Sequence, residues 1–340
     1  MKLNAAFAIM LFTTAAMAAN DVPPPRMDYH VVPLVSDQQG VAPNTDPNLV
    51  NPWGIAEAPG NPLWVSDNGT NLSTLYDPKS GAINPLVVKM SADAPTGAAF
   101  VPPGTGFPIS ESGKKDDSIF VFDTESGAIL GWSNNVDVNK AVVAVDNSAK
   151  GSAYKGLAFD PKDVLLFAAD FVNNQVQVYD KKWNRVRTFT DPSLPKHFAP
   201  FNVAWLNGEL YVAFAKRARG SIDEVDGKGL GYIDTFDAKG HLLQHLIANG
   251  DLNAPWGMLI GPPKFGKFAG DLLVGNFGDG RIHAYNPNTG EFKGKLTTSS
   301  DKTLVIDGLW SLAPGPNDES VIFSAGPDDE KHGLLGQIHH

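Results

Sequence analysis

The segment Asn51-Pro-Trp-Gly-Ile-Ala, near the start of the chain, returns much later as Asn253-Ala-Pro-Trp-Gly-Met-Leu. In both places an apolar run follows and ends in an acidic or amide residue, Asp67 or Asn276. A Gly-containing turn then leads into a second apolar segment that closes with tyrosine. A unit that recurs in this way is typical of a repeat protein, whose fold is decided by the repeat rather than by any single motif.

Aligning the chain on this pattern gives units that begin near residues 51, 95, 154, 199, 254 and 307. Each unit contains three short apolar strands, and most contain a clear fourth. Four short antiparallel strands in units of about forty to sixty residues predict propeller blades. A pair of β-sandwiches is the alternative fold, but it leaves the repeated Pro-Trp-Gly segments unexplained.

The ring needs a closing strand, because the last unit reaches His340 before any outer strand. Residues 29–35 alternate and are rich in β-formers. We therefore expect an all-β, six-bladed β-propeller with four-stranded antiparallel blades, closed by the N-terminal strand pairing with the last blade. Such pairing removes the exposed edge of an open ring.

The amino-acid composition excludes some classes of bond and binding partner. The chain has 340 residues and no cysteine, which excludes disulfides and cysteine-bound metals. It has 27 basic and 37 acidic residues, and this formal charge of -10 argues against a nucleic-acid backbone as partner. We expect a monomer.

The N-terminus has the pattern of a signal peptide. Lys2 precedes an apolar run, and Ala16-Met17-Ala18 fits the small-x-small cleavage rule. The expected organisation is therefore a signal peptide over residues 1–18, a Pro-rich segment over 19–28 and one propeller over 29–340. No other run is apolar enough to span a membrane, so we expect the mature protein to be secreted or periplasmic, with cleavage near Ala18.

Two long insertions open on the same face of the predicted ring. One covers residues 216–231, within the fourth blade, and the other residues 134–153, between the second and third blades. A third, over residues 102–117, falls on the opposite face. Because loops carry function more often than scaffolds do, the face with the first two insertions is the candidate binding face.

The blades resemble NHL-type repeats, most closely in Ala168-Ala-Asp-Phe-Val-Asn-Asn-Gln-Val-Gln-Val-Tyr-Asp. The string of motifs that includes Tyr154-Lys-Gly-Leu-Ala, Gly275-Asn-Phe-Gly-Asp-Gly and Ser324-Ala-Gly-Pro-Asp-Asp resembles a family of secreted, uncharacterised bacterial propellers. That resemblance implies a propeller of the bacterial envelope and implies no reaction. Some members carry a C-terminal sorting tail, a feature that the segment before His340 does not show.

Acidic or amide residues recur just after the second strand, at Asp67, Asp123, Asp170 and Asn276. One interpretation is a ring of oxygen ligands for calcium, with Asp67, Asp170 and Asn276 as the metal ligands. The other is that each side chain accepts backbone N–H bonds within its own turn. Repetition favours the second interpretation, because every blade needs its turn.

Residues near the start of the first strands should line the channel, and they are candidates to bind a small polar ligand. They are Trp53, Lys155, Asn202, Trp256 and Trp310, with Asp170 and Asn276 nearby. The alternative is that the tryptophans only fill the space between blades. A buried lysine needs a partner, for which Asp307 or an acid of the turn positions is suggested.

The charged stretches 216–226 and 328–332 could each form a binding loop or a solvated surface. For residues 216–226 a solvated surface is favoured. His241 and His245 are four apart in a predicted strand, too far for easy shared ligation, so the histidines give no metal-binding pattern. No Gly-x-Ser-x-Gly or Walker motif is present.

These observations predict an exported propeller that binds a small ligand or an envelope protein on its loop-rich face. The alternative is a calcium-dependent lactonase, hydrolase or lyase of the gluconolactonase-like or NHL-like type, argued from the fold alone.

Overall fold

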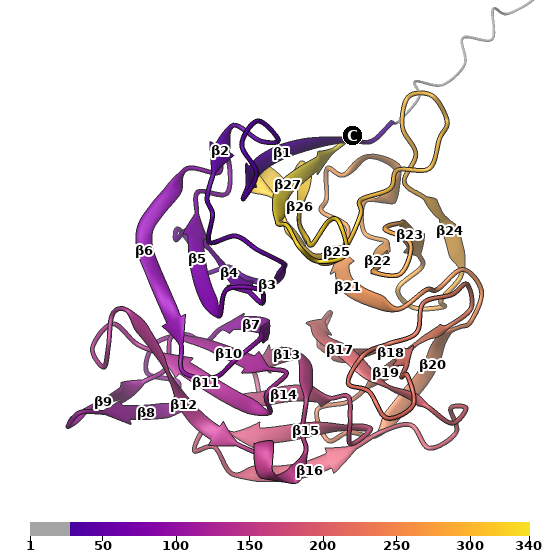
Figure 1. The fold of residues 1–340 in the computed structure, drawn as a ribbon. Helices are drawn as coiled ribbons and strands as arrows, with labels where there is room; N and C mark the ends of the chain where they lie inside the picture. The colour runs from indigo at the N-terminus through magenta and orange to yellow at the C-terminus, as the bar shows by residue number, and fades with distance from the viewer. Residues whose placement is uncertain (1–27) are drawn as a thin grey trace, which may run out of the picture.

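The computed structural model describes residues 28–340, so the predicted signal peptide lies outside the described residues. Six four-stranded antiparallel blades surround a central axis, with the first strand of each blade innermost (Figure 1). The prediction of an all-β propeller is confirmed. The described part of the chain contains no helix with the length and hydropathy needed to cross a bilayer.

The strands follow one another from the axis outward in each blade. Blade 1 consists of β3 (Pro52–Ala56), β4 (Leu63–Asp67), β5 (Leu72–Tyr76) and β6 (Ile83–Met90). Blade 2 consists of β7 (Pro95–Phe100), β10 (Phe120–Thr124), β11 (Ala128–Trp132) and β12 (Lys140–Asp146). Blade 3 consists of β13 (Tyr154–Asp160), β14 (Leu165–Asp170), β15 (Gln175–Asp180) and β16 (Arg185–Phe189). Blade 4 consists of β17 (Phe198–Leu206), β18 (Glu209–Lys216), β19 (Gly231–Phe236) and β20 (Leu242–Ala248).

Blades 5 and 6 complete the ring. Blade 5 consists of β21 (Pro255–Ile260), β22 (Leu272–Asn276), β23 (Ile282–Tyr285) and β24 (Phe292–Lys295). Blade 6 consists of β25 (Leu309–Pro314), β26 (Ser320–Ala325), β27 (Leu334–His339) and β1 (His30–Ser36). Outside the blades lie the short strand β2 (Asn44–Thr45), the hairpin β8 (Pro108–Glu111) and β9 (Lys114–Asp117), and the 3-10 turns Ser148–Lys150, Gly266–Phe268 and Pro316–Asp318.

The ring closes as expected, because β1 pairs antiparallel with β27 and so supplies the outer strand of blade 6. Tyr29, just before β1, is buried against Phe265 and Phe268 of blade 5. Closure therefore joins the N-terminal strand both to the last blade and to its neighbour.

The prediction of an insertion over residues 134–153 was wrong in part. This stretch contains β12, the outer strand of blade 2. Residues Lys140 and Ala141 of β12 also pair in parallel with Lys89 and Met90 of β6, which joins blades 1 and 2 into one sheet. The alternation of β12 was hidden because an outer strand is half exposed and carries little apolar periodicity.

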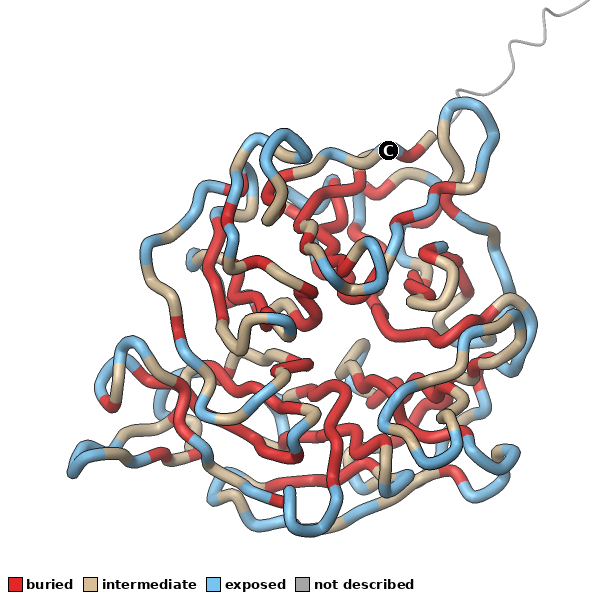
Figure 2. The backbone as a smooth tube through the Cα atoms, in the orientation of Figure 1, coloured by how far each residue is buried: buried red, intermediate tan, exposed pale blue. Residues whose placement is uncertain are grey.

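The hydrophobic core lies mainly between neighbouring blades. One cluster joins blades 3 and 4 through Phe167, Val178, Val212 and Phe214. Burial falls from the axis outward: β14 is almost wholly buried, whereas β16 is mostly exposed (Figure 2). This gradient explains why inner strands are continuous apolar runs and outer strands are not.

Candidate functional site

The first strand of every blade contains one extra residue relative to the second strand. The register shift falls at the same point in all six blades. Such a bulge re-aims the side chains that carry it. The residues at the bulge are Trp53, Thr96, Lys155, Phe201, Trp256 and Trp310.

Glycine follows the bulge in blades 1, 2, 3 and 5, where adjacent first strands approach closely around the axis. A Cβ on Gly156 would lie 1.9 Å from Asn202 Oδ1, and one on Gly54 would lie 2.6 Å from the backbone of Ala98. The Pro-Trp-Gly repeat thus has two roles: the glycine permits this approach and the tryptophan lies near the axis.

The tryptophans form an aromatic layer with Phe171, Phe201 and Phe277. Trp310 stacks between Trp53 and Phe277, with ring centroids 3.5 and 4.0 Å away. Trp256 meets Trp53 and Trp310 edge-on. Trp310 Nε1 donates to Asn51 Oδ1 at 3.0 Å, and Trp256 Nε1 donates to the Lys155 carbonyl at 2.8 Å. This packing agrees with the scaffold interpretation of the tryptophans.

Lys155 is the charged member of the bulge positions, and it is 2% exposed. Its Nζ lies 2.5 Å from Glu125 Oε1 and 5.1 Å from the centre of the Trp53 ring. Glu125 Oε2 accepts a hydrogen bond from Asn68, whose Oδ1 accepts one from Asn51. The partner of Lys155 is therefore Glu125, and the suggestion of Asp307 or a turn acid was wrong.

Two further glutamates act on Lys155. Glu125, Glu224 and Glu330 all lie in connections between second and third strands, in blades 2, 4 and 6. Burial raises the pKa of the Glu224 carboxyl to about 7; Lys155 opposes the rise, while Asp226 and Glu330 add to it. Burial also raises the pKa of Glu330, with Glu125 adding and Lys155 opposing. We call Lys155 and these three residues the glutamate cluster.

This arrangement holds more negative than positive charge near neutral pH. One ammonium faces three carboxyl groups, of which Glu224 exchanges its proton near pH 7. A half-buried carboxyl with that pKa can donate or accept a proton under physiological conditions. Trp53 Nε1 is buried beside the cluster and has no hydrogen-bond partner within residues 28–340.

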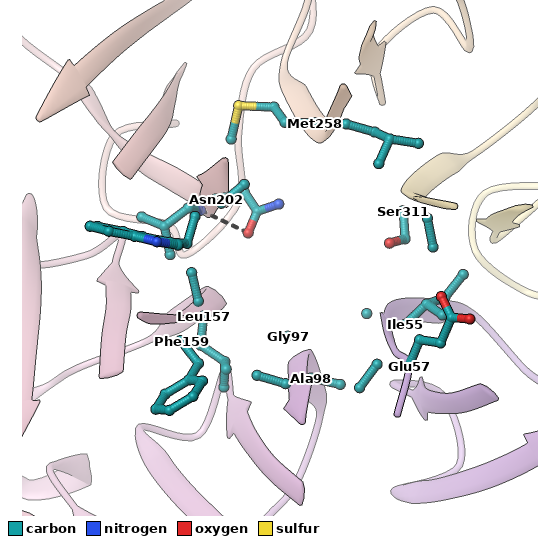
Figure 3. A pocket seen from close by; sticks show the side chains of 18 of the residues that line it. Ile55, Glu57, Gly97, Ala98, Leu157, Phe159, Asn202, Met258 and Ser311 are labelled. Atoms are coloured by element: carbon teal, nitrogen blue, oxygen red, sulfur yellow. Dashed lines mark hydrogen bonds between the residues drawn. The ribbon is translucent and has the colours of Figure 1, made fainter. Parts of the chain in front are cut away.

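The strand segments beyond the bulge enclose a cavity of about 530 Å³ on the axis (Figure 3). Its walls are mostly apolar and include Ile55, Leu157 and Met258. Asn202 lines it, donating to the Trp256 carbonyl at 2.8 Å and accepting from the Val203 amide. Asn202 and Trp256 line this cavity, whereas Lys155, Trp53 and Trp310 do not.

The structure does not bring Asp67, Asp170 and Asn276 together as ligands. Asp170 accepts hydrogen bonds from Asn173 of its own turn, from Gln177 of β15 and from Ser152, which precedes β13. Asn276 Oδ1 accepts from the Asn253 amide, and its Nδ2 donates to the Arg281 carbonyl. Asp67 is fully buried, and burial raises its pKa, an effect that hydrogen bonding from Thr74 of β5 opposes.

Sequence reasoning missed Glu125 altogether and assigned Glu224 and Glu330 to charged loops. Glu125 lies in the turn Asp123-Thr-Glu-Ser-Gly, which resembles an ordinary hairpin connection. The signal that could have found it is its position: it comes two residues after Asp123, in the connection that opens on the loop-rich face.

No protein-family model matches the chain. It is 32% identical to the uncharacterized protein R648 of Acanthamoeba polyphaga mimivirus over 319 residues, covering 90% of this chain and 78% of that protein. It is 33% identical to the uncharacterized protein L690 of the same virus over 320 residues, covering 90% and 84%. The expectation of bacterial relatives was wrong, because these relatives are viral.

Solved structures of streptogramin B lyase and of virginiamycin B lyase from Staphylococcus aureus share the propeller fold. Both superpose with a TM-score of 0.54 over 92% of this chain and at least 98% of theirs, at 13% sequence identity. At that identity the likeness shows the fold alone.

Proposed function

The chain belongs to the family of the mimivirus proteins R648 and L690, and we propose that it binds a small polar ligand at the glutamate cluster. The observation that carries this proposal is the charge at Lys155. A fully buried ammonium at the axis is held by Glu125, while Glu224 and Glu330 remain without a hydrogen bond to it. Half-buried carboxyls without a full set of partners favour a ligand that supplies hydrogen-bond donors.

The chemistry of the cluster selects the ligand class. The excess of carboxyl groups favours amine and hydroxyl groups and disfavours anions. The buried Trp53 Nε1 offers a donor to an acceptor on the same ligand. An amino sugar or another small molecule with both amine and hydroxyl groups satisfies both requirements.

A second candidate is acid–base catalysis by Glu224, whose pKa of about 7 suits proton transfer at neutral pH. The fold shared with a streptogramin B lyase supports a lyase of this kind by analogy only. Among the described residues, the carboxyl groups of the glutamate cluster do not converge closely enough to hold one metal ion. A calcium-dependent form of this alternative is therefore less well supported than a metal-free one.

Export remains part of the proposal. The pattern of residues 1–18 supports a secreted or periplasmic protein cleaved near Ala18. Expression of the full chain in bacteria, followed by mass spectrometry of the periplasmic fraction, should give a mature N-terminus near Ala19. An intact Met1 in a cytoplasmic product would contradict export.

The binding proposal is tested by isothermal titration with glucosamine, glucose and butylamine. We expect heat and a melting shift with glucosamine, and loss of both in a Glu224→Gln, Glu330→Gln variant. Glu57→Gln, at the rim of the cavity at the other end of the axis, is the matched control and should bind like the parent. Equal binding by the double variant, or no binding of the three probes by the parent, would overturn the assignment.

A further inference from the structure

Three potential metal ligands converge away from the axis, at the seam between blades 3 and 4. Asp191 follows β16, Asp234 lies in β19 and His245 lies in β20. One ligand atom from each lies within 4.8 Å of the other two. His245 Nδ1 is 3.2 Å from Asp191 Oδ2 and 3.3 Å from Asp234 Oδ1.

The two carboxyl groups are buried, and that of Asp234 is incompletely satisfied. Each aspartate side chain is 1% exposed, whereas that of His245 is 51% exposed. Asp191 is oriented by Ser193, whose amide and hydroxyl donate to it at 2.8 and 3.0 Å. Asp234 faces Asp191, and its Oδ2 has no hydrogen-bond donor among residues 28–340.

Two buried carboxylates in contact repel each other unless a positive charge lies between them. A shared proton would relieve part of this repulsion. A protonated His245 would also relieve it, since His245 Nδ1 lies within hydrogen-bond distance of Asp234 Oδ1, but neither proton would give Asp234 Oδ2 a partner. A metal ion would use all three side chains and the orienting serine.

The spacing fits a small divalent ion. Zinc bonds of about 2.0–2.1 Å place neighbouring tetrahedral ligands about 3.3 Å apart, which matches the two distances from His245 Nδ1. An imidazole ligand favours zinc-like ions over calcium and magnesium, which prefer oxygen. The exposure of His245 leaves room for water at the remaining position.

We propose that Asp191, Asp234 and His245 bind one divalent ion of the zinc class. The ion would link the segment after the outer strand of blade 3 to the third and outer strands of blade 4. It would therefore stabilise one seam of the ring, independently of any ligand at the glutamate cluster.

The test is titration of the EDTA-treated protein with ZnCl₂, by calorimetry and by thermal melting. We expect one equivalent to bind and, at a hundredfold excess over the dissociation constant, the melting temperature to rise by roughly 5 °C. Calcium and magnesium chlorides should give much smaller shifts. No uptake of zinc by the parent protein would overturn the proposal. The repulsion between Asp191 and Asp234 would then be relieved by a proton rather than by a metal ion.

Three variants locate the site. His245→Ala changes an exposed side chain and should abolish the stoichiometric uptake without unfolding the protein. Ser193→Ala should weaken uptake by roughly tenfold, through loss of the bond that orients Asp191. His241→Ala is the matched control, because His241 pairs with Asp237 on the same blade.

Surface histidines are the main competing zinc ligands. His30 and His339 stack with ring centroids 5.6 Å apart. Unchanged zinc uptake in His245→Ala, together with its loss in His339→Ala, would place the metal there and overturn the assignment to the seam.

Discussion

The two ends of the propeller axis are built from the same six first strands, but they differ in chemistry. At the loop-rich end, Lys155 is surrounded by Glu125, Glu224 and Glu330. At the other end the strands enclose a mostly apolar cavity of about 530 Å³. The aromatic layer around Trp310 lies at the bulge, between these two environments.

The difference shows what the repeat determines and what it leaves free. The backbone bulge repeats in all six blades, and in four of them a glycine follows it. The glutamates come instead from connections of unequal length, which the strand pattern does not constrain. The axial scaffold is thus common to both ends, while the chemistry depends on loops at one of them.

The largest effect should follow removal of residues 29–37, which destroys both ends together. The deletion removes β1 and exposes β27, and it loses the buried side chains of Tyr29, Leu34 and Val35. At 1.5–3 kcal/mol for each large side chain, the loss is roughly 5 kcal/mol or more. Thermal melting should show an unfolded or strongly destabilised protein.

Deletion of residues 19–27 alone is the control, because it keeps β1. An unchanged melting temperature after removal of residues 29–37 would contradict closure by this strand.

Next in size is Trp310→Ala, which would open the layer between the two ends. Trp310 is completely buried and stacks on Trp53 and Phe277. Its removal should reduce the free energy of unfolding by about 4 kcal/mol, measured by urea denaturation. Trp310→Phe keeps much of the stacking and should lose less. Equal losses in both variants would show that the bond to Asn51 dominates.

Much of the fold could be predicted because inner strands are long apolar runs with repeated Pro-Trp-Gly segments. The closing strand was predicted for a physical reason: the last unit lacked an outer strand and residues 29–35 could supply one. The prediction failed at β12, whose exposed surface weakens the apolar pattern.

The site could be predicted only in part. Lys155 was identified because a buried charge needs a partner, but the partner depends on how blades 2 and 3 lie together. Asn202 and Lys155 come from neighbouring first strands, and only Asn202 lines the cavity. Glu224 and Glu330 are far apart in sequence, and nothing local indicates that they converge.

A smaller loss is expected from Lys155→Met, which affects the charged end alone. Removing one partner of a buried pair typically costs about 3 kcal/mol, because the remaining charge lacks compensation. Here Glu125 would be left with only the bond from Asn68. Adding Glu125→Gln should restore part of the stability in urea denaturation. If the double variant were as unstable as the sum of the single variants, the two side chains would not be coupled.

The smallest effect concerns pH and compares the two ends directly. Glu224 has a folded-state pKa of about 7, above its ordinary value of 4.5, because burial disfavours its charged form. Between these pH values the folded state binds more protons than the unfolded state, so stability falls as pH rises. After allowance for solvent screening, the loss is on the order of 1 kcal/mol between pH 5 and pH 8. Glu224→Gln should remove this part of the pH dependence in urea denaturation.

Glu57→Gln is the matched comparison at the cavity rim. Burial raises the pKa of Glu57 too, but this residue is exposed. The stability of Glu57→Gln should therefore depend on pH almost as that of the parent protein does. Asp123, whose pKa is raised to about 7 by burial, contributes equally to all three proteins and cancels in the difference. If Glu57→Gln reduced the pH dependence of the unfolding free energy as much as Glu224→Gln does, the two ends would be electrostatically alike. A flatter curve for Glu224→Gln alone would assign the proton exchange to the loop-rich end, because only there do neighbouring carboxyl groups add to the effect of burial.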